Sequence, residues 1–134
     1  MILFIDQHLP FHRDFQALNV EPPEPYKYYR ELNLFFDKLE AERNDKITIA
    51  LHPGYSYDTR KDSLRDPFNG RTMIWHKTPE LIEKADLILT HWSSSKINKP
   101  CMVLTTKVFD KKTHFMEMTR KRAKELNVEL TFYA

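Results

Sequence analysis

The sequence predicts an α/β protein in which a mainly parallel sheet of five to six strands lies between two layers of helices. The expected strands are short continuous apolar runs, such as Ile2–Asp6, rather than alternating patterns, which is typical of strands buried on both faces. These runs alternate along the chain with segments of helical periodicity. A length of 134 residues suits one such unit, so we expect a single domain over residues 1–134.

The first half of the chain predicts three strands and one long helix. After Ile2–Asp6, the segment Gln7–Pro25 contains four prolines, and we expect a connection too irregular for a helix. Tyr26–Arg43 has apolar residues at helical spacing and predicts a core-facing amphipathic helix. The following strands are Lys46–Leu51 and Arg71–His76, and they are separated by a polar loop over Tyr55–Gly70.

The second half predicts two helices and three strands. Thr78 and Pro79 indicate a helix start, with a capping hydroxyl and a proline at the first helical position. The elements expected after this short helix are the strands Asp86–Thr90 and Cys101–Thr105, a helix over Lys111–Asn127 and a last strand over Val128–Tyr133.

The composition excludes several classes of protein. The 21 basic and 19 acidic residues are scattered, without the dense basic face of a nucleic-acid binder. Cys101 is the single cysteine, and no apolar run has the roughly 20 residues needed to cross a bilayer, so we expect a cytoplasmic protein. Two glycines are too few for a glycine-rich phosphate loop, so any phosphate must be bound by hydroxyls, backbone amides and cations.

Polar side chains follow the carboxyl ends of the predicted strands, where ligands bind in parallel α/β sheets. Four of the six histidines lie there, which suggests one shared cleft. Ser93, Ser94 and Ser95 follow the strand Asp86–Thr90. If a short helix begins there, its free amides and dipole attract a phosphate; alternatively, one serine caps the helix and the others face solvent.

His52 is followed by Pro53 at a strand end, so its ring can donate to a phosphate or a ribose hydroxyl, or bond a loop carbonyl. A metal-dependent hydrolase is another hypothesis, because Asp6, His8 and His12 are ligand types that zinc prefers. Pro10 prevents the regular helix that would place His8 and His12 on one face, and we expect no metal.

Several motifs together resemble the nucleotide-sugar-binding half of GT-B glycosyltransferases. They are His52-Pro53 after KITIAL, the segments KTPELIEKADLILTHWSSS and KPCMVLTT, and the opening FIDQHLPFHRD followed by YYRELNLFFDKLE. The resemblance covers about residues 2 to 106 and is strongest to bacterial capsule and other surface-carbohydrate enzymes of the sialyltransferase-like kind. It implies a Rossmann-like domain, the C-terminal donor-binding half of a two-domain enzyme.

The resemblance implies roles for individual residues. His52 would be catalytic and contact the leaving phosphate, and the donor would be held by a set of residues comprising Ser93, Ser94, Ser95, His91, Thr78, Glu80 and Arg60. The donor would be a CMP- or CDP-linked sugar, without a metal or other cofactor. The carbohydrate acceptor would bind a second domain, and the full enzyme could associate peripherally with a membrane.

Two departures from the family pattern leave an alternative open. Gly54 stands where the family has a cation, and the connection from Thr90 to Cys101 is at the lower limit for a crossover that contains a helix. We expect a donor-binding domain that is inactive without its partner domain. The alternative is a non-catalytic interaction protein that retains the fold.

Overall fold

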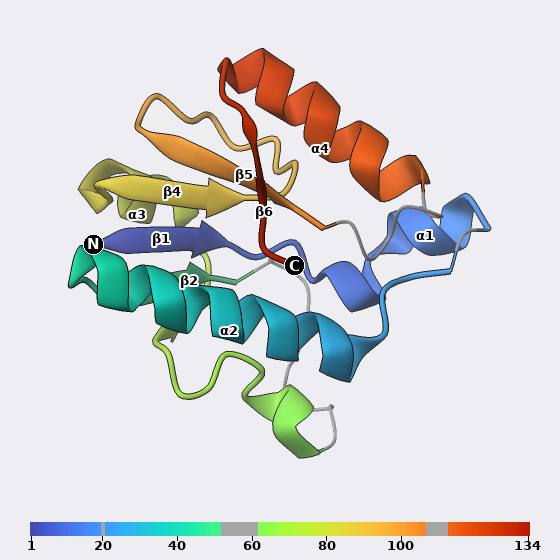
Figure 1. Ribbon diagram of the computed structural model, residues 1–134, viewed down its shortest axis with the longest axis horizontal. Coiled ribbons are helices and arrows are strands. Elements are labelled where there is room, and N and C mark those ends of the chain that lie inside the picture. Colours follow the sequence, from blue (N-terminus) through green and yellow to red (C-terminus); the bar gives the residue numbers. More distant parts are fainter. Residues whose placement is uncertain (20, 52–61, 107–112) are drawn as a thin grey trace.

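The computed structural model describes residues 1–19, 21–51, 62–106 and 113–134. Within these residues, six parallel strands form one sheet in the order β3-β2-β1-β4-β5-β6, with helices on both faces (Figure 1). The predicted α/β class and parallel sheet are therefore confirmed. The strand order is that of the doubly wound Rossmann fold, in which β1 and β4 lie side by side at the centre.

The strands lie within the segments that their apolar runs predict. They are β1 (Ile2–Ile5), β2 (Ile47–Ala50), β3 (Met73–Ile74), β4 (Leu87–Thr90), β5 (Cys101–Thr105) and β6 (Leu130–Phe132). Strand β3 has two residues where six were expected, because only Met73 and Ile74 pair with β2 at this edge. The helices are α1 (Arg13–Ala17), α2 (Pro25–Arg43), α3 (Thr78–Lys84) and α4 (Thr113–Leu126).

The prediction that the segment between β1 and α2 contains no helix is wrong. A 3-10 helix over Leu9–Phe11 and the short helix α1 occupy it. Pro10 is tolerated because it stands in the first turn of the 3-10 helix, where a backbone N–H has no partner within the helix. The polar loop after β2 likewise contains a 3-10 helix, Asp62–Arg65.

Helix α2 forms where the sequence predicts it and has a well-defined start and end. The carboxylate of Glu24 accepts hydrogen bonds from the backbone N–H groups of Tyr26 and Lys27, and Pro25 occupies the first turn. Asn44 ends the helix in the left-handed conformation, with φ of 50°. The helix packs one face against the sheet through a buried stripe of Tyr28, Tyr29, Leu32, Phe36 and Leu39.

The α2 face of the sheet holds the larger core cluster. Phe4 of β1 is fully buried and contacts Phe36 and Phe68 in edge-to-face arrangements, with ring centroids 5.1 and 6.0 Å apart. Leu89 and Leu104 extend this cluster across β4 and β5. The alternation of side chains along each strand thus sends Phe4 and Leu89 to the same layer as α2.

The opposite face is covered by α3 and α4. Leu81 and Ile82 of α3 pack with Leu3, Ile5 and Ile88, which alternate with the residues of the first face. In α4, the buried hydroxyl of Thr119 donates to the hydroxyl of Thr105 in β5 over 3.1 Å. The sheet therefore lies between two helical layers, as expected.

The connection from β4 to β5, residues 91–100, contains no helix. The sequence hypothesis of a helix N-terminus at the serines is therefore wrong. Ile97 instead packs against the α3-side core, and the Lys99 ammonium donates to the carbonyls of Glu83 and Ala85 at the end of α3. A cation at a helix C-terminus is favourable, so these two side chains fix a connection too short for a helix.

The expected hydroxyl cap of α3 is also wrong. The helix begins at Thr78, its capping position is Lys77, and no side chain there bonds the free amides. Pro79 stands at the second helical position, not at the first as predicted, although still within the first turn.

The β3 edge is fastened to α2 by the side chain of Arg71, which is 8% exposed. Its guanidinium donates to the carboxylates of Asp37 and Glu40 and to the side-chain oxygen of Asn33, over 2.6, 2.9 and 2.8 Å. Burial alone would raise the pKa of Glu40, but the hydrogen bonds from Arg71 and the backbone of Ile47 lower it below its usual value. This network attaches the two-residue strand β3 to α2, because β3 forms few backbone hydrogen bonds with β2.

Candidate functional site

A cleft of about 530 Å³ opens at the carboxyl ends of the central strands. Its lining comes from the residues after β1, the end of β2, the residues after β4, and single side chains of α1, α3 and α4. Strands β1 and β4 are neighbours from which the chain leaves in opposite directions along the sheet. Ligands of doubly wound sheets bind in the crevice at such a switch point. The cleft is therefore the candidate site.

The ends of β1 and β4 are joined directly. The side-chain oxygen of Gln7 accepts a hydrogen bond from the backbone N–H of Trp92 over 2.6 Å, and both residues are buried. Asp6 forms a tight turn, because its carboxylate accepts from the backbone N–H of His8, which has φ of 58°. The cleft is thus lined by two residues that are 85 positions apart in sequence and joined by a hydrogen bond.

The three predicted serines line the cleft on a loop that is held by its own hydroxyls. The Ser93 hydroxyl donates to the Ser95 hydroxyl over 3.0 Å and accepts from the Ser95 backbone N–H over 3.2 Å. The proton of the Ser95 hydroxyl then points to no acceptor within this pair. Ser94 is exposed. The guanidinium of Arg122, 13% exposed, donates to the Ser95 carbonyl over 2.7 Å and also pairs with the carboxylate of Glu125 over 3.5 Å.

The cleft lining also includes His12 and Asp14, from the segment in which no helix was expected. The Asp14 backbone N–H donates to the His12 ring nitrogen Nδ1 over 3.2 Å. The Asp14 carboxylate also lies 3.9 Å from Nε2 of His114 in α4. The indole of Trp92 contacts the rings of His12 and His114 edge-on, at centroid distances of 6.1 and 5.9 Å. Together they place aromatic and carboxylate groups in the same cleft as the serines.

His91 does not line the cleft but lies fully buried in the core. Its Nδ1 is 2.7 Å from the Leu104 carbonyl, which can only accept, so Nδ1 carries the proton. Nε2 then accepts from the Tyr28 hydroxyl, also over 2.7 Å. Burial lowers the pKa of His91 to about 4, although the bond to Leu104 opposes the shift. The ring is neutral and structural, which corrects its assignment to the ligand site.

The remaining predicted residues fall in three places. Thr78 lines the cleft, whereas Glu80 is exposed and outside its lining. His52 and Arg60 lie outside the described residues. The expectation that strand-end histidines share one cleft is not met by the described ones, since His8 and His91 are buried and His76 is exposed.

Asp6, His8 and His12 do not form a metal site with one another. In the part of the chain that the structure describes, no three histidine, cysteine, aspartate or glutamate side chains converge as metal ligands would. The reason is local: Asp6 and His8 are engaged in the turn after β1, and the 3-10 helix separates His8 from His12. The metal-dependent hydrolase therefore lacks a geometric basis among these residues.

Three residues important to the cleft were missed from sequence, namely Gln7, Trp92 and Arg122. Gln7 and Trp92 each lie two residues past the end of a strand, but their hydrogen bond depends on β1 and β4 being neighbours. Arg122 left a signal, because it shares a helical stripe with the apolar residues Phe115 and Met118. A cation in the core-facing stripe of a helix indicates a hydrogen-bond acceptor nearby. Here that acceptor is the Ser95 carbonyl.

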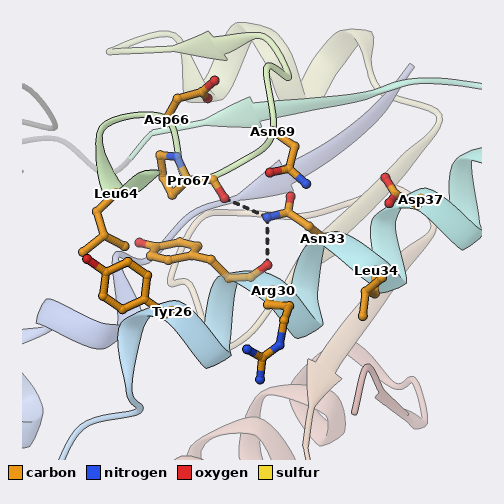
Figure 2. A pocket seen from close by; sticks show the side chains of 10 residues that line it. Tyr26, Arg30, Asn33, Leu34, Asp37, Leu64, Asp66, Pro67 and Asn69 are labelled. Carbon is orange, nitrogen blue, oxygen red and sulfur yellow. Dashed lines mark hydrogen bonds between the residues drawn. The ribbon is translucent and has the colours of Figure 1, made fainter. Parts of the chain in front are cut away.

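A second pocket, of about 220 Å³, lies between α2 and residues 64–69 (Figure 2). The Asn33 amide points between them and donates to the carbonyls of Tyr29 and Pro67, both over 2.8 Å. The side-chain oxygen of Asn33 accepts a hydrogen bond from Arg71. The amide group of Asn33 is therefore already hydrogen-bonded at both its nitrogen and its oxygen. None of the lining residues belongs to a strand, so the pocket is a weaker candidate.

A comparison of the chain with protein-family models, with curated protein sequences and with solved structures found no match. None of the helices within the described residues combines the length and the apolar character needed to cross a bilayer.

Proposed function

We propose that the cleft binds a nucleotide-activated sugar, and that the chain is the donor-binding domain of a cytoplasmic glycosyltransferase of bacterial surface polysaccharide biosynthesis. The observation that carries this proposal is the position of the cleft at the switch point between β1 and β4, with Ser93–Ser95 on one wall. The motif resemblance to the donor-binding half of GT-B enzymes supplies the class of ligand.

The serine loop would bind the phosphate of the donor. The Ser95 hydroxyl receives its hydrogen bond from Ser93 and keeps its own proton for a ligand oxygen. The guanidinium of Arg122 adds positive potential behind the loop. The described lining contains no lysine or arginine, so this indirect charge matters for an anion.

The part of the lining around Asp14 suits the hydroxyl-rich part of the donor. The carboxylate of Asp14, which is 44% exposed, can accept hydrogen bonds from ribose or sugar hydroxyls. The indole of Trp92 contacts the ring of His12 and also lines the cleft. Phosphate at the serines and hydroxyls at Asp14 give the donor one orientation across the cleft.

Transfer itself would need a partner domain to bring the carbohydrate acceptor. In the proposed reaction, the charge that develops on the departing phosphate is stabilised by the hydroxyls and amides of the serine loop and by His52, without a metal. The isolated domain then binds the donor but does not turn it over.

A second candidate, a non-catalytic interaction protein, is favoured by one observation. The connection that carries the serines has no helix, so the loop lacks the helix N-terminus that strengthens many phosphate sites. This candidate predicts that the cleft binds no nucleotide.

Calorimetric titration with CMP, CDP, UDP and the nucleoside cytidine tests the proposal. We expect a phosphate-bearing nucleotide to bind at least about tenfold more tightly than cytidine, because the serine loop contacts the phosphate. Ser95→Ala should weaken that binding about fivefold, the effect of one lost hydrogen bond, and Thr72→Ala, an exposed hydroxyl outside the cleft, should not. Binding by none of the nucleotides, or equal effects of the two substitutions, would refute it.

A further inference from the structure

A groove of about 450 Å³ lies on the α2 face of the sheet, between α2 and strands β5 and β6. We call it the α2–β6 groove; Met102 and Tyr133 form part of its floor. It exists because α2 is placed over the other half of this face, while α3 and α4 cover the opposite one. The groove is separate from the cleft and independent of the proposed function.

Large apolar side chains stand exposed at its rim. Leu34 of α2 is 63% exposed, and Phe132 of β6 is 43% exposed. Exposed apolar groups beside an apolar hollow mark an interaction surface more often than isolated ones do. One patch therefore carries both protruding side chains and a hollow of the size that such side chains fill.

The rim also carries two charges of opposite sign. Lys38 and Glu42 stand one helical turn apart on α2, both exposed, and neither has an ion-pair partner among the described residues. Two α2 helices that run antiparallel about a two-fold axis bring Lys38 of each copy opposite Glu42 of the other. A single surface thus provides both halves of two ion pairs, as an isologous interface requires.

From these observations we propose that the α2–β6 groove is the interface of a homodimer. A second copy of this chain packs its α2 antiparallel along the groove, with Lys38 of each copy paired with Glu42 of the other and the exposed Leu34 of each copy covered by its partner. A different partner protein would have to supply matching charges of its own, whereas a second copy has them by symmetry.

Sedimentation velocity over about 2 to 200 µM tests this, because a dissociation constant in the micromolar range falls within it. We expect the wild type to pass from monomer to dimer across this range. Leu34→Glu should raise the dissociation constant at least about tenfold, since it places a charge in an apolar contact. Leu18→Glu is the matched control, because Leu18 is 53% exposed and outside the groove.

A charge swap tests the arrangement of the two helices. Lys38→Glu and Glu42→Lys should each weaken the dimer about three- to tenfold, because like charges then face each other. The double variant K38E/E42K should restore the wild-type dissociation constant. Thermal melting of each variant, in which the substituted residue is exposed, serves as the control that the fold is intact.

Three results would overturn the proposal. They are a wild type that stays monomeric throughout, a dimer that Leu18→Glu weakens as much as Leu34→Glu does, and a double variant no tighter than the single ones. The first would leave the groove to a partner of another kind.

Discussion

The buried ring of His91 should make the stability of this protein fall steeply in mild acid. In the folded state its Nε2 accepts from Tyr28, its Nδ1 donates to Leu104, and its pKa is about 4. In the unfolded state the ring has the ordinary histidine pKa of about 6.5. Between these values the unfolded chain binds a proton that the folded chain does not, so protons favour unfolding.

The size of the effect follows from the shift. Each pKa unit corresponds to about 1.4 kcal/mol, so the full shift is worth about 3 kcal/mol, all of it present above pH 6.5 and lost by about pH 4. Between pH 7.5 and pH 5.0, this one ring should lower the free energy of unfolding by about 2 kcal/mol. The replacement His91→Gln removes the titration and should remove this part of the pH dependence.

Urea denaturation followed by tryptophan fluorescence at several pH values between 7.5 and 4.5 measures the slope. His91→Gln will be less stable at every pH, and its pH dependence should be smaller than that of the wild type by the amount above. His76→Asn is the matched control: the ring is exposed, and asparagine tolerates the φ of 58° at this position. We expect it to keep the wild-type slope.

Proton NMR of the wild-type histidine rings checks the same reasoning without a substitution. The His91 resonances should not titrate above about pH 5. A midpoint near 6.5 for this ring, or a His91→Gln variant with the slope of the wild type, would refute the reasoning.

Two further predictions concern the anchoring of α2. Arg71→Met should lower the free energy of unfolding by about 2–4 kcal/mol in urea denaturation, because it strands the partly buried Glu40 and leaves Asn33 without its donor; an effect below about 0.5 kcal/mol would show that the network adds little. Glu24→Ala should cost about 1 kcal/mol, the usual effect of losing an N-terminal cap, whereas the exposed Glu21→Ala before the helix should be neutral. Equal losses from the two glutamates would argue against the cap.

The sequence by itself determined the class of fold. Continuous apolar runs such as ILFI and LIL indicate burial on both faces, and burial on both faces requires a sheet between two helical layers. The stripe that includes Tyr28, Leu32 and Phe36 defined α2 because a helix of five turns repeats its signal several times. The helix over Arg13–Ala17 escaped notice because its five residues lie among prolines and give no such repetition.

Only the tertiary structure decided which residues share the cleft. Periodicity records whether a side chain is buried, but not which strand lies beside which. The adjacency of β1 and β4 joins Gln7 to Trp92, and the packing of α4 brings Arg122 to the serine loop.

His91 shows the same limit most clearly. In sequence it is a polar residue after a strand, like the serines that follow it. It becomes a core residue because Phe4, Phe115 and Tyr133 close around it from three distant parts of the chain. Burial by these three side chains lowers the pKa of His91 and keeps its ring neutral. The sequence around His91 does not show which distant residues will bury it.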